Sequence, residues 1–330
     1  MIKKLLLLLF VITFNSYSQN NYLDFDGLDD NVNVPNSDNL VANATAISMS
    51  CKVYPKRVSF GFPDFNGIMG YRNESNFDFY LIQLSSTDVE ARFRNAAGEA
   101  YTITYTGLVL NQWTQFFLVY NGSTLKLYNG TAEVGSVAAS GSAPASSSGS
   151  LKIGLVQYQA FNWYHSGYID EASLWNKALS PTDISNIVAN NGEIINPGGE
   201  TNLKAYYKFN QGVAYGNNTG LTTLTDAMGL TNGTLANFGL NGQASNWGSN
   251  ILDVSHFGQN AIQVYPNPAS DQIAVSGLVS GADITILDTT GRIVSREKLS
   301  GESTIDVSNL TSGVYFLGIN DNQKIRFIKN

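Results

Sequence analysis

The sequence predicts an all-β protein built of two β-sandwiches, one large and one small. Short runs of alternating apolar and polar residues recur through to residue 209, each bounded by Gly, Asn or Pro. A period of two is that of strands with one buried face. The chain also contains 31 Gly, 17 Tyr and 17 Phe, a composition typical of strands joined by tight turns. After residue 250 the composition changes, which sets apart a compact second unit of ~70 residues.

The N-terminus has the pattern of a secretory signal peptide over residues 1–18. Two lysines precede an apolar run from Leu5 to Phe14, and small residues follow up to Ser18. The run is too short to span a bilayer comfortably. We therefore expect cleavage after Ser18, export of the mature chain, and no transmembrane segment within it.

Alternating runs follow one another through the large unit. Two of them are separated by Asn121, Gly122 and Ser123, which predicts a hairpin. The expected strands are residues 21–25, 31–35, 46–55, 77–84, 88–94, 101–105, 114–120, 124–130, 151–156 and 203–209.

One short helix is expected among these strands. Ser180 can cap its N-terminus, and Pro181 suits the first helical position. Ile184 and Ile187 give it an apolar stripe, and Gly192 ends it.

Charge and cysteine content narrow the class of protein. The net charge is −7 and only 14% of residues are charged, without basic blocks, so nucleic acid and anionic lipid are not expected partners. The single cysteine, Cys51, excludes an intrachain disulfide and lies in an alternating run. We expect it to be a core residue of a strand.

Acidic residues crowd the stretch LDFDGLDDNVNVP at residues 23–35. The alternation places Leu23 and Phe25 in the core and the aspartates in a turn between two strands. Gly27 allows a positive φ there. Carboxylates and carbonyls at a strand end are the oxygens that a hard cation needs, and a solvated turn is the alternative. The spacing is not that of an EF-hand.

The C-terminal unit, residues 262–330, follows a predicted linker at 251–261. It carries VYPNPASD, then ITILDTTGRIV, then IDVSNLTSGVYFLGI, and it ends in KIRFIKN. In these motifs it resembles the C-terminal sorting domain of the type IX secretion system of Gram-negative bacteria. The resemblance implies an immunoglobulin-like β-sandwich that the secretion machinery reads and its sortase removes, leaving a product that is released or attached to the outer surface. The residues it implies for sorting are Pro266, Asn267, Pro268, Gly313, Tyr315, Lys324 and Lys329.

The large unit, residues 20–250, resembles the laminin-G-like domains of the concanavalin A-like superfamily. The aspartate stretch, residues 111–130 and residues 167–184 carry this resemblance, while residues 203–250 resemble a terminal module that completes such a sandwich or forms an appendage. The resemblance implies a jelly roll with a structural Ca²⁺ where the opening turn meets the late strand. The ligands it implies are Asp26, Asp29, Asp170 and the carbonyl of Gly27.

We expect no catalytic residues. The Glu-x-Asp-x-x-Glu arrangement of concanavalin A-like glucanases is missing from the sequence. Asp170 and Glu171 are neighbours, so on a regular strand they would point to opposite faces and could not share a substrate. His165 and His256 have no metal-binding spacing.

A binding surface is expected instead. Sugars stack on aromatic rings while polar groups bind their hydroxyls, and aromatic residues cluster in the loop at 156–168. The candidate ligand-binding residues are Tyr158, Trp163, Tyr164 and His165, and we expect Trp163 and Tyr158 to be exposed. For any single ring, packing at a sheet edge is the alternative.

These observations predict an exported protein, secreted or held on the outer surface, that binds a glycan. A protein-binding adhesin or a structural surface protein that contacts an extracellular matrix or surface protein is the alternative. A polysaccharide hydrolase or lyase is the third possibility.

Overall fold

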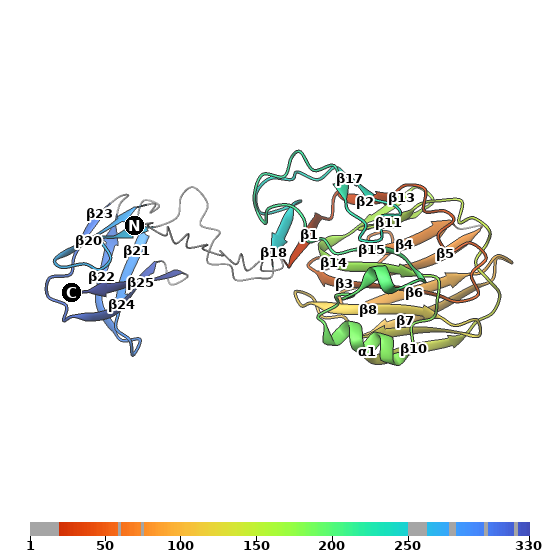
Figure 1. The fold of residues 1–330 in the computed structure, drawn as a ribbon, viewed down its shortest axis with the longest axis horizontal. Coiled ribbons are helices and arrows are strands. Elements are labelled where there is room, and N and C mark those ends of the chain that lie inside the picture. The colour runs from red at the N-terminus through yellow and green to blue at the C-terminus, as the bar shows by residue number, and fades with distance from the viewer. Residues whose placement is uncertain are drawn as a thin grey trace, which may run out of the picture. The chain divides into compact units, whose positions relative to one another are not determined.

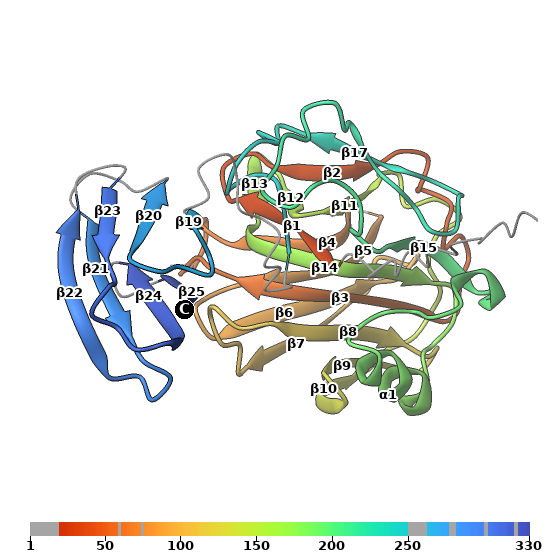
Figure 2. The same cartoon turned by 60° about the vertical axis from the view of Figure 1, so that its left-hand side comes forward.

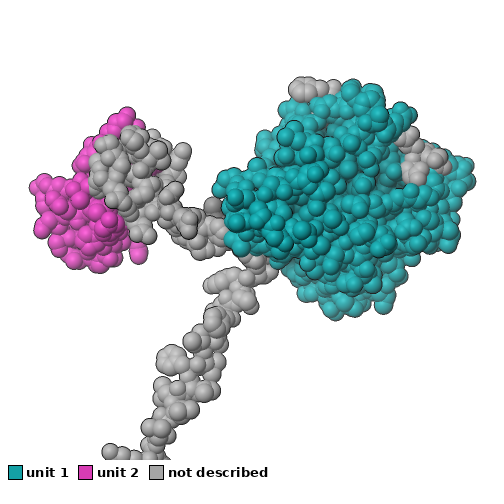
Figure 3. Space-filling view, turned by 90° about the horizontal axis from the view of Figure 1, so that it is seen from above, with its two compact units in different colours: residues 1–251 teal, residues 252–330 magenta. Residues whose placement is uncertain are grey.

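The structure, a computed structural model, describes residues 20–58, 61–73, 76–249, 263–276, 282–299, 303–319 and 323–330. The predicted signal peptide and linker lie outside the described residues. The chain forms two compact units, Met1–Ile251 and Leu252–Asn330, which Figure 3 shows in different colours.

Two antiparallel sheets of eight strands build the first unit (Figure 1). In the first, which we call sheet A, the order is β10-β9-β8-β3-β14-β1-β18, and β15 also pairs with β14. Its strands are β1 (Asn21–Asp26), β3 (Ile47–Pro55), β8 (Thr114–Tyr120), β9 (Thr124–Asn129), β10 (Ala132–Ala138), β14 (Ser166–Trp175), β15 (Leu203–Tyr207) and β18 (Trp247–Ser249).

The second sheet, sheet B, has the order β16-β17-β2-β11-β4-β5-β6-β7. Its strands are β2 (Asn31–Val34), β4 (Asn66–Asn73), β5 (Phe77–Gln83), β6 (Asp88–Arg94), β7 (Ala100–Thr106), β11 (Leu151–Ile153), β16 (Thr223–Leu224) and β17 (Gly233–Ala236). A separate hairpin consists of β12 (Leu155–Tyr158) and β13 (Phe161–Tyr164).

A single hydrophobic core lies between the two sheets. Alternate residues of the strands supply it, as the sequence predicts: Leu23 and Phe25 of β1 and Cys51 of β3 are all fully buried. Burial raises the pKa of the Cys51 thiol to about 12, so the thiol stays protonated. The predicted all-β sandwich is confirmed.

Residues 203–249 belong to both sheets. β15 pairs with β14 and β18 pairs with β1, whereas β17 extends sheet B beyond β2. The Trp247 side chain is fully buried in the core, and its indole Nε1 donates to the Phe209 carbonyl at 3.1 Å. This segment therefore forms part of the sandwich rather than an appendage.

The predicted helix is confirmed as α1 (Pro181–Ala189), and a 3-10 turn η1 (Pro197–Gly199) follows it. The Ser180 hydroxyl accepts from the Asp183 backbone N at 3.1 Å, and the Asp183 carboxylate accepts from the Ser180 backbone N at 2.8 Å. Ile184 and Ile187 are buried against the outer face of sheet A, where α1 lies beside β8 and β9 (Figure 2). Neither helix is long enough to cross a membrane, and the described part of the chain contains no other that could.

The second unit is a smaller pair of sheets. One sheet has three strands in the order β19 (Gln263–Tyr265), β20 (Gln272–Ser276) and β23 (Ser303–Asp306). The other has four in the order β22 (Ile293–Leu299), β21 (Ala282–Leu287), β24 (Gly313–Ile319) and β25 (Gln323–Lys329). Apolar residues of both sheets, among them Ile273, Ile286 and Leu317, share one core.

Trp247→Ala tests whether β18 is integral to the first unit. Because it empties a fully buried site and removes a hydrogen bond, we expect a loss of about 3–5 kcal/mol in the free energy of unfolding. Urea unfolding followed by circular dichroism measures it. Leu230→Ala is the control, because that side chain is 61% exposed and its loss should change stability by less than about 0.5 kcal/mol. Equal, small effects of both substitutions would show that the segment is dispensable.

Candidate functional site

Three aspartates meet in the turn between β1 and β2. The carboxylate oxygens of Asp26, Asp29 and Asp30 lie within 4.8 Å of one another. Asp26 Oδ1 accepts from the backbone N of Leu28 at 2.8 Å, and Asp30 Oδ2 accepts from the backbone N of Asp26 at 2.9 Å. These bonds fix the turn and hold three carboxyl groups together.

Asp30 is the member of this cluster that the sequence analysis missed. It is buried, and Ser245 donates to its Oδ1 at 2.9 Å. Burial raises the pKa of Asp30 to about 7, and the charges of Asp26 and Asp29 add to this rise. Asp30 directly precedes β2, so its place in the turn could have been predicted from the sequence. Its hydrogen bond from Ser245 could not, because Ser245 is distant in the chain.

Gly27 occupies the tightest point of the turn. Its φ is +79°, and a Cβ there would lie 2.6 Å from the Cβ of Ser166, so glycine is required. Its carbonyl oxygen accepts a hydrogen bond from Arg57 Nη1 at 3.4 Å. The resemblance implies Ca²⁺ as the partner of this oxygen, whereas in the structure its partner is Arg57.

Asp170 does not join the aspartate turn. The register of β1 and β14 pairs Asp26 with Ser166, which is four residues and thus roughly 13 Å from Asp170 along the strand. Asp170 is fully buried, and its Oδ2 lies 3.6 Å from Lys52 Nζ. The expectation that Asp170 shares a site with Asp26 and Asp29 is therefore wrong.

A β-bulge in β14 places Asp170 and Glu171 on the same face. The register with β3 shifts between Asp170 and Ser173, and Glu171 has a φ of +50°. Ile169 and Ala172 on either side point into the core, so both carboxyls lie on the outer face of sheet A. The prediction that they point to opposite faces is wrong, because it assumed a regular strand.

Both carboxyls of the bulge are covered. Asp170 is 0% and Glu171 3% exposed, and the Tyr206 hydroxyl donates to Glu171. Burial raises the pKa of both groups, and the charge of Asp170 raises that of Glu171 further. A glycan on the surface could not reach either group.

The predicted ligand-binding residues divide between core and surface. Trp163 is 3% exposed and its Nε1 donates to the Pro63 carbonyl at 3.1 Å, and His165 is fully buried beside Phe25. The expected exposure of Trp163 is therefore wrong: β13 turns this ring down onto Tyr80 of sheet B. Tyr158, which was also expected to be exposed, is half-buried because its ring stacks on Trp163, and Tyr164 is half-buried as well.

Four aromatic rings form a patch where the hairpin meets the loop that precedes β4. The Phe62 ring is 58% exposed, and its centroid lies 5.0 Å from that of Phe161 and 6.5 Å from that of Tyr158. Tyr158 stacks on Trp163 with centroids 5.7 Å apart. We call Phe62, Phe65, Tyr158 and Phe161 the aromatic patch.

Comparison with known proteins identifies both units. Residues 25–185 match the sequence profile of the concanavalin A-like lectin/glucanases superfamily, and residues 263–330 match that of the secretion system C-terminal sorting domain. The chain carries a concanavalin A-like domain and a type IX sorting domain. Both resemblances are confirmed, and the sorting domain indicates secretion or attachment to the outer surface.

Solved structures similar to this chain have low sequence identity. A candidate carbohydrate-binding protein from Bacteroides ovatus is 18% identical with a TM-score of 0.48, and the match covers 66% of this chain and 58% of that one. A heptameric pentraxin from Limulus polyphemus is 15% identical with a TM-score of 0.42, covering 53% of this chain and 85% of that one. Domain 4 of an arabinanase from Geobacillus stearothermophilus is 18% identical with a TM-score of 0.37, and the match covers 46% of this chain and 69% of that one. No curated protein matches the sequence.

In the sorting domain, the segment that starts with Pro266 is bonded to the last strand. Asn267 Nδ2 donates to the Arg326 carbonyl at 3.2 Å, and Asn267 Oδ1 accepts from the backbone N of Ile328 at 2.9 Å. Tyr315 of β24 is buried against Phe327. Pro268, Gly313 and Lys324 are exposed, and Lys329 is half-buried.

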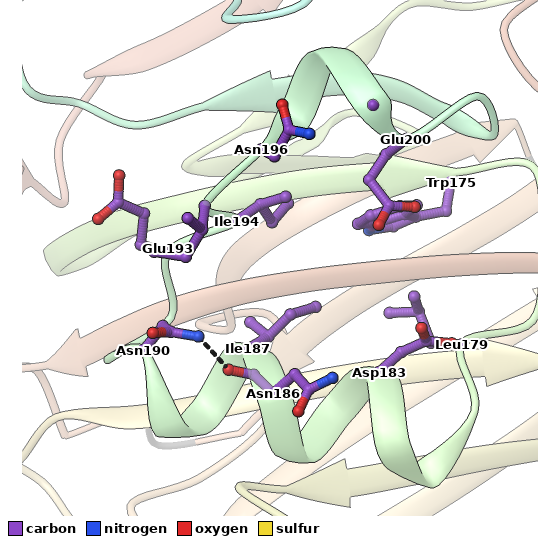
Figure 4. A pocket seen from close by; sticks show the side chains of 12 residues that line it. Trp175, Leu179, Asp183, Asn186, Ile187, Asn190, Glu193, Ile194, Asn196 and Glu200 are labelled. Carbon is purple, nitrogen blue, oxygen red and sulfur yellow. Dashed lines mark hydrogen bonds between the residues drawn. The ribbon is translucent and has the colours of Figure 1, made fainter.

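The concanavalin A-like domain also has a small cleft between α1 and the loop at 193–200 (Figure 4). Its volume is about 230 Å³, and Trp175, Ile187 and Ile194 form its apolar part. The carboxylates at its rim are paired: Lys177 lies 3.3 Å from Glu200, and Lys208 lies 2.8 Å from Glu193. The rim therefore has little free charge with which to select a ligand.

His165 makes the stability of the concanavalin A-like domain depend on pH. Burial, with Lys56 and Arg57 nearby, lowers the pKa of the imidazole to about 3. The unfolded chain takes up a proton near pH 6.5, so stability falls as the pH falls below this value. Between pH 7 and pH 5 the free energy of unfolding should therefore decrease. In His165→Gln we expect this decrease to be smaller by about 2 kcal/mol.

Urea unfolding at the two pH values measures this difference, in which any general destabilisation by the substitution cancels. An unchanged loss in the variant would mean that the folded domain protonates His165 normally.

Proposed function

We propose that the concanavalin A-like domain binds a glycan at the aromatic patch. The single observation that carries this proposal is the 58% exposure of Phe62 among three further rings. Exposed apolar side chains that adjoin one another mark ligand- or partner-binding surfaces more often than single ones do, and the C–H faces of sugars stack on aromatic rings. Trp163 supports the patch from below, where it stacks under Tyr158.

Export fits this role. We infer that the sorting domain directs the chain through type IX secretion, and that a sortase then removes it. The glycan-binding domain would then act outside the cell, either released or attached to the outer surface, where polysaccharides are accessible.

Phe62→Ala is the direct test of the patch. We expect a loss of glycan affinity of about fivefold or more, equivalent to about 1 kcal/mol, with little change in stability because the ring is mostly exposed. A glycan array followed by isothermal titration measures the affinity. Tyr265→Ala, which removes a ring that is 50% exposed in the other unit, is the matched control.

A folded protein that binds no glycan on a broad array would refute the proposal and favour an adhesin that binds protein. Shortened sugars appearing during incubation with a polysaccharide would instead show a hydrolase or lyase.

We further propose that the aspartate turn binds a structural Ca²⁺ through Asp26, Asp29 and Asp30. Oxygens bound to one Ca²⁺ at about 2.3–2.6 Å are at most about 5 Å apart, and the three carboxylates satisfy this limit. The raised pKa of Asp30 supports the proposal as well, since a cation would relieve the crowding of negative charge that helps to raise it.

Calcium should stabilise the domain, and more so at higher pH. Folded Asp30 keeps a proton up to about pH 7, whereas the unfolded residue loses it near pH 4, so stability without metal falls as the pH rises through this window. Ca²⁺ needs the ionised carboxylate, so its effect grows over the same window. At a hundredfold excess over Kd we expect a rise in Tm of about 5–10 °C at pH 8 and a smaller rise at pH 5.5.

Thermal unfolding with and without Ca²⁺ measures this effect. Asp29→Asn should abolish the response, whereas Glu133→Gln, the same loss of charge on β10, should leave it intact. A response of equal size at both pH values, or one retained in Asp29→Asn, would exclude this site.

A further inference from the structure

The outer face of sheet B carries an excess of positive charge. The register of β4, β5 and β6 places Arg72 and Arg94 on either side of Asp78. Arg92 of β6 and Lys152 of β11 lie one row further along the same face, since side chains two apart on a strand point the same way. We call Arg72, Arg92, Arg94 and Lys152 the basic face.

Among the residues that the structure describes, two carboxylates lie among these four cations. Asp78 is fully buried, and its Oδ2 accepts from Arg94 Nε at 2.9 Å and lies 4.0 Å from Arg92 Nη1. Glu90 lies 3.9 Å from Arg92 Nε. The balance of these described side chains is 4 − 2 = +2, on a chain whose net charge is −7. A third acid, Asp88, lies at the far end of β6 and is bonded to Thr106 and Ser85.

Arg72 and Lys152 are the least neutralised of the four. Within the described residues, neither forms an ion pair with a carboxylate. Lys152 Nζ donates a hydrogen bond to Asn33 Oδ1 at 3.2 Å, and partial burial lowers the pKa of Lys152. Its amine would therefore gain from an anionic partner.

The position of Arg72 is set by aromatic rings. Its guanidinium carbon lies 4.4 Å from the centroid of Tyr158, 4.9 Å from that of Tyr80 and 5.3 Å from that of Trp163. Such contacts hold a guanidinium in place. Its Nη1 also donates to the Tyr80 hydroxyl, so a bound acid would use another N–H group of the same guanidinium. Tyr158 also belongs to the aromatic patch, so patch and basic face are contiguous.

We propose that the glycan bound here is acidic, a polysaccharide that bears uronate carboxylates or sulfate esters. Its sugar rings stack on the aromatic patch, and its acidic groups bind to Arg72, Lys152 and Arg92. This inference rests on the proposed function and specifies the substrate class of the same site. Carboxylate and sulfate both accept hydrogen bonds from guanidinium and ammonium groups.

The test compares polygalacturonate, dextran sulfate and neutral dextran as ligands of the full chain. Affinity electrophoresis and isothermal titration at low and high NaCl measure binding. We expect one or both acidic polymers to bind and dextran not to bind, with the affinity falling as salt screens the charges. Which acidic polymer binds more tightly distinguishes carboxylate from sulfate recognition.

Lys152→Gln and Arg72→Gln identify the contacts. Each removes a charged hydrogen-bond donor, so we expect about tenfold weaker binding of the acidic polymer. Lys126→Gln is the matched control, because it removes the same charge from β9 of sheet A, where Lys126 pairs with Glu133 at 2.8 Å. Since Arg72 also supports the hairpin, circular dichroism verifies that its variant is folded, and Lys152→Gln tests the inference independently.

Three outcomes would overturn the inference. Neutral glycans bound as tightly as acidic ones, with Phe62→Ala weakening both, would leave the proposed function intact but reject acidic selectivity. Equal losses in Lys126→Gln and Lys152→Gln would show attraction by overall charge rather than a site. Absence of binding to any glycan would reject the proposed function itself.

Discussion

The pleat of paired strands is the constraint on which the rest of this structure depends. The long strands of sheets A and B give every second side chain to the core that the two sheets share. Only the alternate positions are therefore free to differ in chemistry. In β4 to β6 those positions carry Arg72, Asp78 and Arg94, while Phe79 and Phe93 fill the core. The strands that bury the aromatic core thus also set the spacing of the basic face.

A break in the regular pleat of β14 places two carboxyl groups, those of Asp170 and Glu171, on the outer face of sheet A. The bulge in β14 adds one residue between Ile169 and Ala172, both of which stay in the core. The added position turns a second carboxyl outward, and the loop after α1 covers it: the backbone N of Ile194 donates to Tyr206, whose hydroxyl donates to Glu171. The bulge is thus tied to the segment that follows α1, and Lys52 supplies the compensating charge at 3.6 Å from Asp170.

The sequence was informative where local rules act alone. Period-two patterns predict the core strands, and the cap at Ser180 predicts α1, because both depend on residues close together in the chain. The candidate site was predicted only in part. Asp26 and Asp29 are neighbours in sequence and meet as expected, but Asp170 is displaced by a register that depends on all of β14. The burial of Trp163 also depends on distant contacts, since it packs on Tyr80 of another strand.

An acidic chain can still present a basic face where strand pairing brings cations together. Net charge sums over all residues, whereas a ligand responds to the charges within a Debye length of about 8–10 Å. Strand pairing gathers Arg72, Arg92 and Arg94 from positions up to 22 residues apart (94 − 72 = 22) around one buried aspartate. Net charge, on which the expectation about nucleic acid and anionic lipid rests, governs diffuse attraction. It does not describe a face in which strand register concentrates cations beside an exposed ring.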